Sequence, residues 1–388
     1  MNLFYWSPFL SKVATVKAVL NSAISVRKYS KELIHPYIIN SVGEWNEFKE
    51  EILKNDIGLI NFVNNSKNYE FLPRYGFIRS RLSYLIIFFS SFYQLFNFLK
   101  LRKNEDYILI HLISSLPLIL AIFFNFKCKF ILRVSGYPKM NFVRKFLWKM
   151  ANKKLFLIFC PTKDTKKYLE KIKIFDRKKL FVLYDPIIEF NKFYKIKNEN
   201  LDEVNPQEFI LSVGRLTKQK NHKFLIQNFK NILNTFPTLK LVILGDGELK
   251  KDLINQSKKL NIQDNIIFKG YVKNVYKYYK NAFCFILSSE WEDPGFVLIE
   301  AASSRAPILS ADCPNGPKEF LDYEKGGYLY EQNNNKSFIE KFQLLVENKR
   351  NKQNVHLSKI LYAMKKCKNY TNFRHFINLS KTIIANKT

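Results

Sequence analysis

EWEDPGFVLIEA, residues 290–301, carries two glutamates, Glu292 and Glu300, on either side of a Pro-Gly turn. The uncharged run after the turn predicts a helix that begins near Phe296, directly after the apolar strand FCFILSS at 283–289. A strand that leads through a loop into a helix is typical of an open parallel α/β sheet, whose ligands bind outside the carboxyl ends of the strands. The stretch therefore predicts a fold class and a candidate binding site together.

Apolar runs alternate with amphipathic ones on both sides of this stretch, and 388 residues are too many for one ordinary core. We predict an α/β protein with two facing Rossmann-like domains and a cleft between them. The predicted parts are an N-terminal domain at 1–190, a polar linker at 191–207, a C-terminal domain at 208–365, and a final helix at 366–388 that crosses back to the N-terminal domain.

The net charge of +30 is concentrated in residues 127–179, which hold 17 Lys and Arg against three acids. A basic surface of this kind meets nucleic acid or an anionic membrane, and a composition rich in lysine accounts for part of the excess. The sequence has no zinc finger, RNA-binding aromatic motif or basic zipper. We therefore predict a membrane surface as partner, and no nucleic acid.

The cysteines and the apolar runs bear on the cellular location. Five cysteines without metal-ligand spacing favour reduced thiols in the cytosol, and the N-terminus lacks the pattern of a secretory signal. Two runs carry no charge, at 84–99 and 107–126. The second is about as long as a membrane span, but its polar residues divide it into a strand, a turn and a helix that begins at Pro117. We expect a buried βαβ unit there; a true span and a helix resting on the bilayer are the alternatives.

The two glutamates allow two interpretations. One carboxylate can accept hydrogen bonds from two vicinal hydroxyls of a ribose or a hexose, and the N–H groups at a helix start favour anions and polar oxygens. The alternative is a solvated loop acid followed by a glutamate that interacts with the helix dipole. Spacing alone leaves both interpretations open.

A second segment, SVGRLTKQKNHKFL, places Arg215 and Lys220 in a loop between a strand that ends at Gly214 and an amphipathic helix. Both cations can converge on a pyrophosphate in front of the helix N-terminus, or they can be solvated loop cations. The GDG sequence at 245–247 matches neither a dinucleotide-binding fingerprint nor a Walker loop, and it predicts a tight turn.

Five segments, in their order and spacing, carry a resemblance: VGRLTKQKN, LGDG, FKGYV, SSEWEDPGFVLIEAA and SADCPNGPKEFL. They resemble the nucleotide-sugar half of a family-four retaining glycosyltransferase of the GT-B fold, whose E-x7-E signature matches Glu292 and Glu300. The resemblance covers about 209–330. The first half is similar more weakly, because SPFLSKVATVKAVL lacks the glycines that the family often has there. The backbone of Ser11 and Lys12 could still supply the phosphate contacts.

The resemblance implies roles in the second half. Arg215 and Lys220 would bind the donor diphosphate next to Gly214, and Glu300 would hold the ribose hydroxyls. Glu292 would act as a catalytic group beside the reacting carbon of the donor sugar. The backbone amides that would complete this donor site belong to Gly295 and Phe296.

In the first half, His111 follows the strand DYILIH and matches a histidine-bearing loop that approaches the donor sugar in the family. A buried structural histidine is the alternative. At another strand end, Arg133, Ser135 and Gly136 could face the cleft. In the segment LPRYGFIRSR, the residues Arg74, Arg79 and Arg81 could contact an anionic acceptor or could form a solvated basic loop.

The resemblance implies a transferase that moves a sugar from a UDP- or GDP-linked donor, with retained anomeric configuration, onto a lipid-linked surface polysaccharide such as capsule or lipopolysaccharide. Because no DxD triplet occurs, Arg215 and Lys220 are expected to replace a metal, and we predict no metal and no cofactor. The expected location is cytoplasmic, peripheral on the inner face of the cell membrane. A nucleotide-sugar epimerase of the same fold and a non-catalytic basic binding protein are the alternatives.

Overall fold

The computed structural model describes residues 1–10, 14–62, 72, 77–136, 138, 140–188, 201, 205–292, 294–351 and 354–386, with the backbone only at 77–80. The chain forms two compact units. The first unit comprises Met1–Ile187 and Asn372–Thr388, and the second comprises Ile188–Thr371. Each is built on one parallel sheet, as the alternation of apolar and amphipathic segments predicts.

The sheet of the first unit has seven strands in the order β3-β2-β1-β4-β5-β6-β7. Strand β1 pairs in parallel register with β2 on one side and with β4 on the other, so that Trp6 lies opposite Ile39 and Ile110. The strands therefore end at one common edge. Their bounds are β1 (Asn2–Trp6), β2 (His35–Asn40), β3 (Gly58–Asn61), β4 (Asp106–Ile110), β5 (Lys129–Arg133), β6 (Leu155–Cys160) and β7 (Leu180–Val182).

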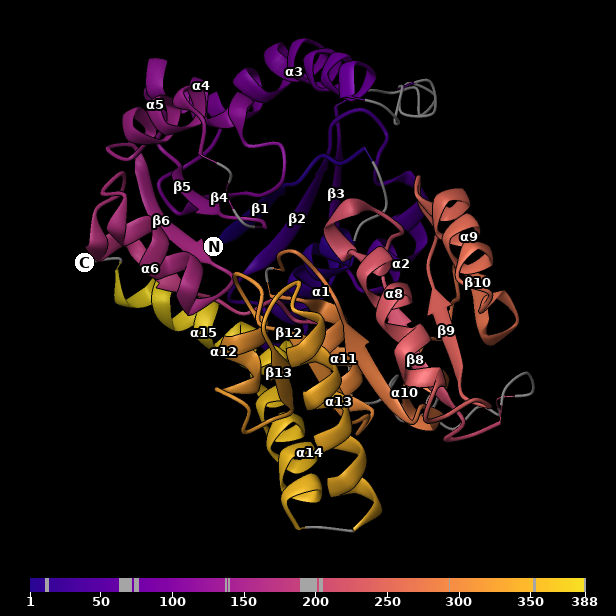
Figure 1. Ribbon diagram of the computed structural model, residues 1–388. Helices are drawn as coiled ribbons and strands as arrows, with labels where there is room; N and C mark the ends of the chain where they lie inside the picture. The colour runs from indigo at the N-terminus through magenta and orange to yellow at the C-terminus, as the bar shows by residue number, and fades with distance from the viewer. Residues whose placement is uncertain are drawn as a thin grey trace. The chain divides into compact units, whose positions relative to one another are not determined.

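Helices cover both faces of this sheet, and each face has its own apolar core (Figure 1). Successive side chains of β1 alternate between the two cores, with Leu3 in one and Phe4 in the other. One face packs against α1 (Ala14–Tyr29), α2 (Lys49–Lys54) and α15 (Asn372–Ala385). The other packs against α3 (Phe77–Lys100), α4 (Ser115–Phe123), α5 (Phe142–Ala151) and α6 (Lys163–Lys171). The short helices η1 (Asn46–Phe48) and η2 (Arg177–Lys179) lie in loops.

The uncharged run at 107–126 holds most of β4 and all of α4, and β5 follows it to complete the predicted βαβ unit. Helix α4 begins at Ser115, two residues earlier than the sequence predicts, and Pro117 lies in its first turn. A proline is tolerated there because the first N–H groups of a helix have no partner within the helix.

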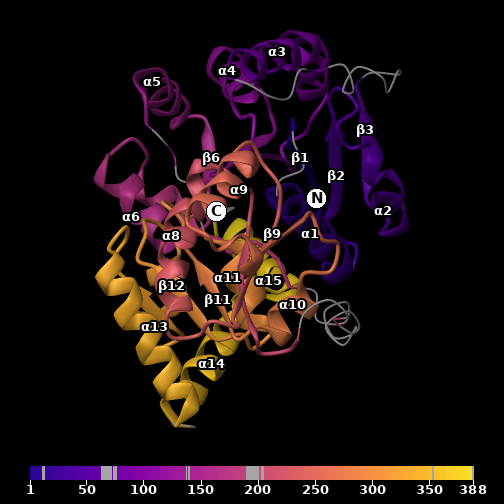
Figure 2. The same cartoon turned by 45° about the vertical axis from the view of Figure 1, so that its right-hand side comes forward.

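The last helix, α15, is distant in sequence from the unit to which it belongs, and it lies beside α1 in Figures 1 and 2. His375 of α15 fixes this packing from both ring nitrogens. Its Nε2 is 2.7 Å from Ser22 Oγ of α1, and its Nδ1 is 2.8 Å from the carbonyl oxygen of Tyr184. Burial lowers the pKa of His375 to about 4, so the ring that joins the two segments is neutral near pH 7.

The second unit has a six-stranded parallel sheet in the order β10-β9-β8-β11-β12-β13. The strands are β8 (Phe209–Val213), β9 (Lys240–Leu244), β10 (Ile266–Gly270), β11 (Cys284–Leu287), β12 (Ile308–Ala311) and β13 (Tyr328–Tyr330). The helices are α8 (His222–Leu233), α9 (Lys250–Lys259), α10 (Tyr276–Asn281), α11 (Phe296–Ser303), α12 (Pro317–Leu321), α13 (Asn335–Arg350) and α14 (Asn354–Lys366). The 3-10 helices in the described part of this unit are η3 (Lys218–Lys220), η4 (Gln263–Asn265) and η5 (Cys367–Tyr370).

Candidate functional site

The loops that follow β8 and β11 meet at the carboxyl edge of the second sheet, where ligands of parallel sheets bind. The backbone N–H of Glu290 donates to the carbonyl oxygen of Gln219 at 2.8 Å, and the Gln219 amide donates to the carbonyl oxygen of Trp291 at 3.0 Å. The Ser288 hydroxyl donates to the carbonyl oxygen of Lys220 at 2.9 Å. The two sequence segments that suggested a site are therefore held against each other.

Glu292 is the buried acid of this edge, with 5% of its surface exposed. Its Oε1 accepts hydrogen bonds from the Lys220 ammonium and from the Ser289 hydroxyl, the latter at 2.6 Å. Its backbone N–H donates to the carbonyl oxygen of Pro314 at 3.1 Å. A buried carboxylate needs partners of this kind, because an unpaired buried charge costs several kcal/mol. The structure thus joins the cation predicted to bind phosphate directly to the carboxylate predicted to face the sugar.

Gly295 makes the turn that leads from Glu292 into α11. Its φ of 87° and ψ of 70° are left-handed, and this conformation is strained for residues with a side chain. Helix α11 then begins at Phe296, as predicted. Its first N–H groups lack partners within the helix, which leaves them available to anionic or polar oxygens.

Glu300 lies in the second turn of α11, next to a buried tyrosine. The Tyr279 hydroxyl donates to Glu300 Oε2 at 3.4 Å. Burial, and then the neighbouring Glu300 carboxylate, raise the pKa of Tyr279, so this hydroxyl stays protonated and remains a donor. The hydrogen bond orients the carboxylate whose predicted role is to hold ribose hydroxyls.

Two further predicted donor-site residues of this edge, Gly214 and Arg215, lie directly after β8. Arg215 is exposed and has no ion-pair partner among the described residues. A Cβ added at Gly214 would lie 3.0 Å from Lys220 Cδ, so the absence of a side chain leaves room for the lysine stem. The two cations thus differ: Lys220 is held by Glu292, whereas Arg215 projects toward solvent.

The glycine turn after β9 packs against the loop that carries Arg215, and it offers a test of the local structure. A Cβ at Gly245 would lie 2.0 Å from the carbonyl oxygen of Gly214, and φ at Gly245 is 132°. We expect Gly245→Ala to lower the free energy of unfolding by about 3 kcal/mol or more, because strain and a backbone clash add together. The control is Gly270→Ala, where φ is 71° but no atom lies within 4 Å, and we expect a loss of only about 1 kcal/mol. Urea unfolding measures both, and equal losses would contradict the packing.

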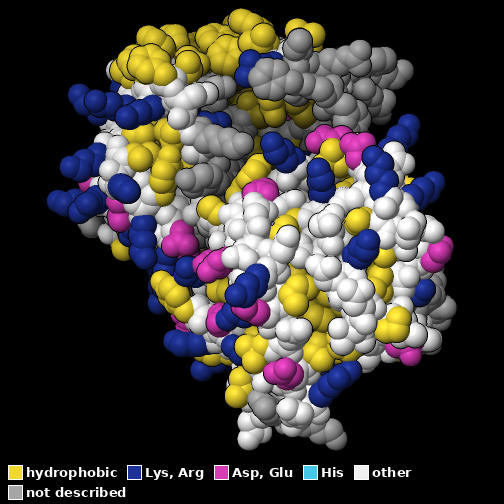
Figure 3. Space-filling model, viewed as in Figure 1, with side chains coloured by type: hydrophobic (Ala, Val, Ile, Leu, Met, Phe, Trp, Pro, Cys, Tyr) yellow, Lys and Arg dark blue, Asp and Glu magenta, His cyan; other side chains and the backbone are white. Residues whose placement is uncertain are grey.

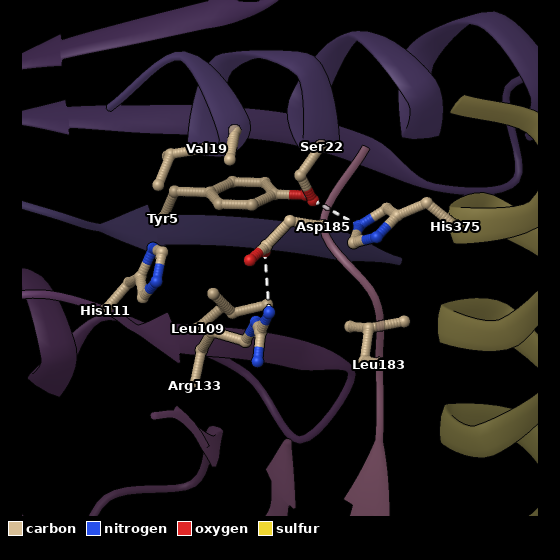
Figure 4. A pocket seen from close by; sticks show the side chains of 10 residues that line it. Tyr5, Val19, Ser22, Leu109, His111, Arg133, Leu183, Asp185 and His375 are labelled. Carbon is tan, nitrogen blue, oxygen red and sulfur yellow. Dashed lines mark hydrogen bonds and ion pairs between the residues drawn. The ribbon is translucent and has the colours of Figure 1, made fainter. Parts of the chain in front are cut away.

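His111 lies in the first unit, at the carboxyl end of β4, and its ring is buried in a small cavity (Figure 4). Beside it Arg133 Nη2 donates to Asp185 Oδ1 at 2.6 Å, in an ion pair whose side chains are 3% and 9% exposed. Burial, and then the Arg133 guanidinium, lower the pKa of His111 to about 3, so the ring is neutral near pH 7. This geometry favours a structural role for the His111 side chain, and a catalytic role stays a prediction.

Sequence reasoning missed several residues that shape these two places. Ser289 donates a hydrogen bond to Glu292, and Asp185 accepts one from Arg133. His375 contacts the carbonyl oxygen of Tyr184 near the end of the first unit's main segment. A signal for Asp185 was present, since an acid directly after the apolar segment FVLY is typical of a strand-end site. His375 gave no signal, because its partner Ser22 is 353 positions away.

Some predicted contacts lie outside the described residues, namely those of Ser11, Lys12 and Arg74, together with the Arg79 side chain and most of the linker at 191–207. Among the described residues, no three His, Cys, Asp or Glu side chains gather as metal ligands would.

The second unit matches a known family. Residues 194–362 match the family described as glycosyl transferases group 1. An uncharacterized glycosyltransferase of Methanocaldococcus jannaschii is 37% identical over 183 residues, which are 46% of this chain and 44% of that protein. A Campylobacter jejuni enzyme is 33% identical over 54% of this chain and 57% of its own length. It is named N-acetylgalactosamine-N,N'-diacetylbacillosaminyl-diphospho-undecaprenol 4-alpha-N-acetylgalactosaminyltransferase. The chain spans about half the length of these curated relatives.

Solved structures extend the likeness to both units. The Anabaena protein HepE, in complex with UDP, superposes with a TM-score of 0.74 at 12% identity, over 99% of this chain and 100% of that one. Such a likeness establishes the fold. The predicted GT-B fold and the resemblance to group 1 glycosyltransferases are therefore confirmed.

Proposed function

We propose that this chain, a group 1 glycosyltransferase by its family match and its GT-B fold, transfers a hexose from a nucleotide-sugar donor to a lipid-linked acceptor. The observation that carries the proposal is the cluster of Glu292, Lys220 and Ser289 in front of the N-terminus of α11. A buried acid, a cation and the first amides of a helix in one place suit a ligand that has both hydroxyl groups and a diphosphate.

The chemistry follows from these charges. The bond between the anomeric carbon and the diphosphate oxygen breaks while the oxygen of an acceptor hydroxyl forms the new bond at the same carbon, and the proton of that hydroxyl passes to the departing diphosphate. The charge that develops on the departing diphosphate is stabilised by Arg215, by Lys220 and by the first amides of α11. Glu292 orients the sugar hydroxyls and holds the Lys220 ammonium in place. We propose that these two cations make the reaction independent of a metal and that the sugar keeps its anomeric configuration.

The comparisons support the choice of donor and acceptor. HepE was solved with UDP, and the name of the Campylobacter enzyme includes an undecaprenol-linked acceptor. We propose a UDP-linked donor rather than a GDP-linked one, and an acceptor that grows into a surface polysaccharide on a lipid carrier. Such an acceptor requires the enzyme to work at the inner face of the cell membrane, as a peripheral protein.

Calorimetric titration of UDP and GDP sugars, with and without EDTA, tests the donor site. We expect UDP-sugar binding that EDTA leaves unchanged and that Glu300→Ala weakens about tenfold or more, because hydrogen bonds to a charged group are lost. The matched control is Glu340→Ala, which removes an exposed helix glutamate of the same unit. Binding that needs a metal, or equal binding by both variants, would contradict these assignments. Chromatography of the products separates transfer from epimerisation, which would change the donor sugar without any acceptor.

A further inference from the structure

The first unit carries a large exposed apolar surface that neither of its cores uses. We define the apolar face as the exposed large apolar residues of α3, of the end of α4 and of α5: Leu82, Tyr84, Leu85, Ile86, Phe89, Phe92, Tyr93, Phe123, Phe124, Phe142, Val143, Phe146 and Met150. Figure 3 shows apolar side chains gathered where Figure 1 places these helices. Large contiguous apolar patches are rare on protein surfaces and mark interaction sites.

The three helices of the face are held together, so the face is one surface. Helices α3 and α4 pack on each other, as do α4 and α5. The Phe96 ring of α3 meets the Phe124 ring after α4 edge to face, with their centroids 4.8 Å apart. At the other end, Trp148 of α5 is buried in the core beneath, which fixes the side from which Phe142 and Phe146 project.

Helix α3 shows how the face would meet an apolar partner. Its stretch Arg81–Lys100 is long and apolar enough to cross a membrane, the one such helix among the described residues. However, Ile87, Leu95 and Leu99, which lie on one side of the helix, are fully buried in the first unit. A crossing helix would have to leave these contacts. The helix therefore lies flat on the unit with its opposite side, which includes Phe89, exposed.

Charge decides which partner fits. Residues 77–154 hold 14 Lys and Arg against two acids. On α5, Lys145 and Lys149 are exposed within the same helix as the apolar residues Phe142 and Phe146. An exposed apolar strip edged by cations is the pattern of helices that lie in the interface of an anionic bilayer. A second copy of this chain would bring cations against cations, which disfavours a dimer through this face.

We propose that the apolar face binds an anionic lipid bilayer, with α3 lying parallel to the membrane plane and its exposed side inserted at the boundary between headgroups and acyl chains. This proposal adds a membrane-binding surface to the proposed function. Only the presence of the acceptor, which a lipid carrier would present at the same bilayer, depends on that function. Binding to the lipid itself needs neither donor nor acceptor, so it is measured without them.

Sedimentation with vesicles of phosphatidylglycerol and phosphatidylcholine in equal parts tests the face. We expect the protein to bind these vesicles and to bind pure phosphatidylcholine more weakly. Phe89→Glu and Phe142→Glu should each weaken binding about tenfold or more, because an inserted aromatic ring is replaced by an anion. Leu357→Glu, at a residue of α14 that is 56% exposed, is the matched control and should bind like the wild type. Unchanged binding by both face variants, or no binding by the wild type, would overturn the proposal.

A second measurement distinguishes a flat helix from a crossing one and from a dimer. All five native cysteines are buried, so an engineered Phe89→Cys can be labelled selectively with an environment-sensitive fluorophore. We expect a blue shift on anionic vesicles at position 89, none for Leu357→Cys, and release of the protein by alkaline carbonate. Resistance to carbonate would replace the proposal by a membrane span. A dimer that Phe89→Glu dissociates, without lipid binding, would replace it by contact between copies.

Discussion

Glu292→Gln is expected to reduce turnover by about 100-fold or more while the protein stays folded and still binds its donor. The substitution keeps the shape of the side chain but removes the charge that holds Lys220. That ammonium, with 13% of its side chain exposed, loses its ionic partner at the place where charge develops on the diphosphate. The loss should therefore fall on kcat more than on KM. The contact between a correctly held Lys220 and the diphosphate strengthens as negative charge develops there, so its loss raises the barrier more than it weakens donor binding.

Release of UDP in the presence of a lipid-linked acceptor measures this effect. The control is Glu331→Gln, which makes the same change at an exposed glutamate of the second unit and should keep full activity. Circular dichroism and donor titration on the same samples show whether the variant is folded. Normal turnover by Glu292→Gln would remove the catalytic role proposed for this carboxylate, and a rise in KM alone would make it a binding residue.

Asp185→Ala is expected to have the largest effect on stability, a loss of about 3–5 kcal/mol, because it leaves a buried arginine without its counter-ion. Arg133 is only 4% exposed, so water cannot replace the missing carboxylate. The neutral rings of His111 and His375 line the same cavity and supply no negative charge. Urea unfolding measures the loss.

Two variants make the test specific. Asp56→Ala breaks the Arg27–Asp56 pair, whose acid is 78% exposed, and should cost less than about 1 kcal/mol. Arg133→Met combined with Asp185→Leu removes both charges and should recover much of the loss, since apolar side chains can replace a buried pair. A small effect of Asp185→Ala, or a double variant worse than the single, would contradict the assignment of the cost to an unpaired charge.

Local patterns predicted the secondary structure of the site, and distant pairings escaped prediction. The start of α11 at Phe296 followed from a strand, a Pro-Gly turn and an uncharged run, all within a few residues. The pairing of Lys220 with Glu292 spans 72 positions, and the sequence placed both residues at one ligand without joining them. For α3, the sequence shows an uncharged run at 84–99, but only packing shows that Ile87 faces the unit while Phe89 does not.

The return of α15 to the first unit sets the order in which the protein can be completed during synthesis. Domains usually fold as they leave the ribosome, the N-terminal one first. Here the first unit lacks Leu379, Ile383 and His375 until translation has passed the whole second unit. One side of its apolar core therefore stays exposed to water until α15 is made. A chain that stalls or is cleaved shortly after Thr371 would contain a complete second unit and an unfinished first one. Quality-control proteases would then recognise the exposed core of the first unit, although this unit was synthesised first.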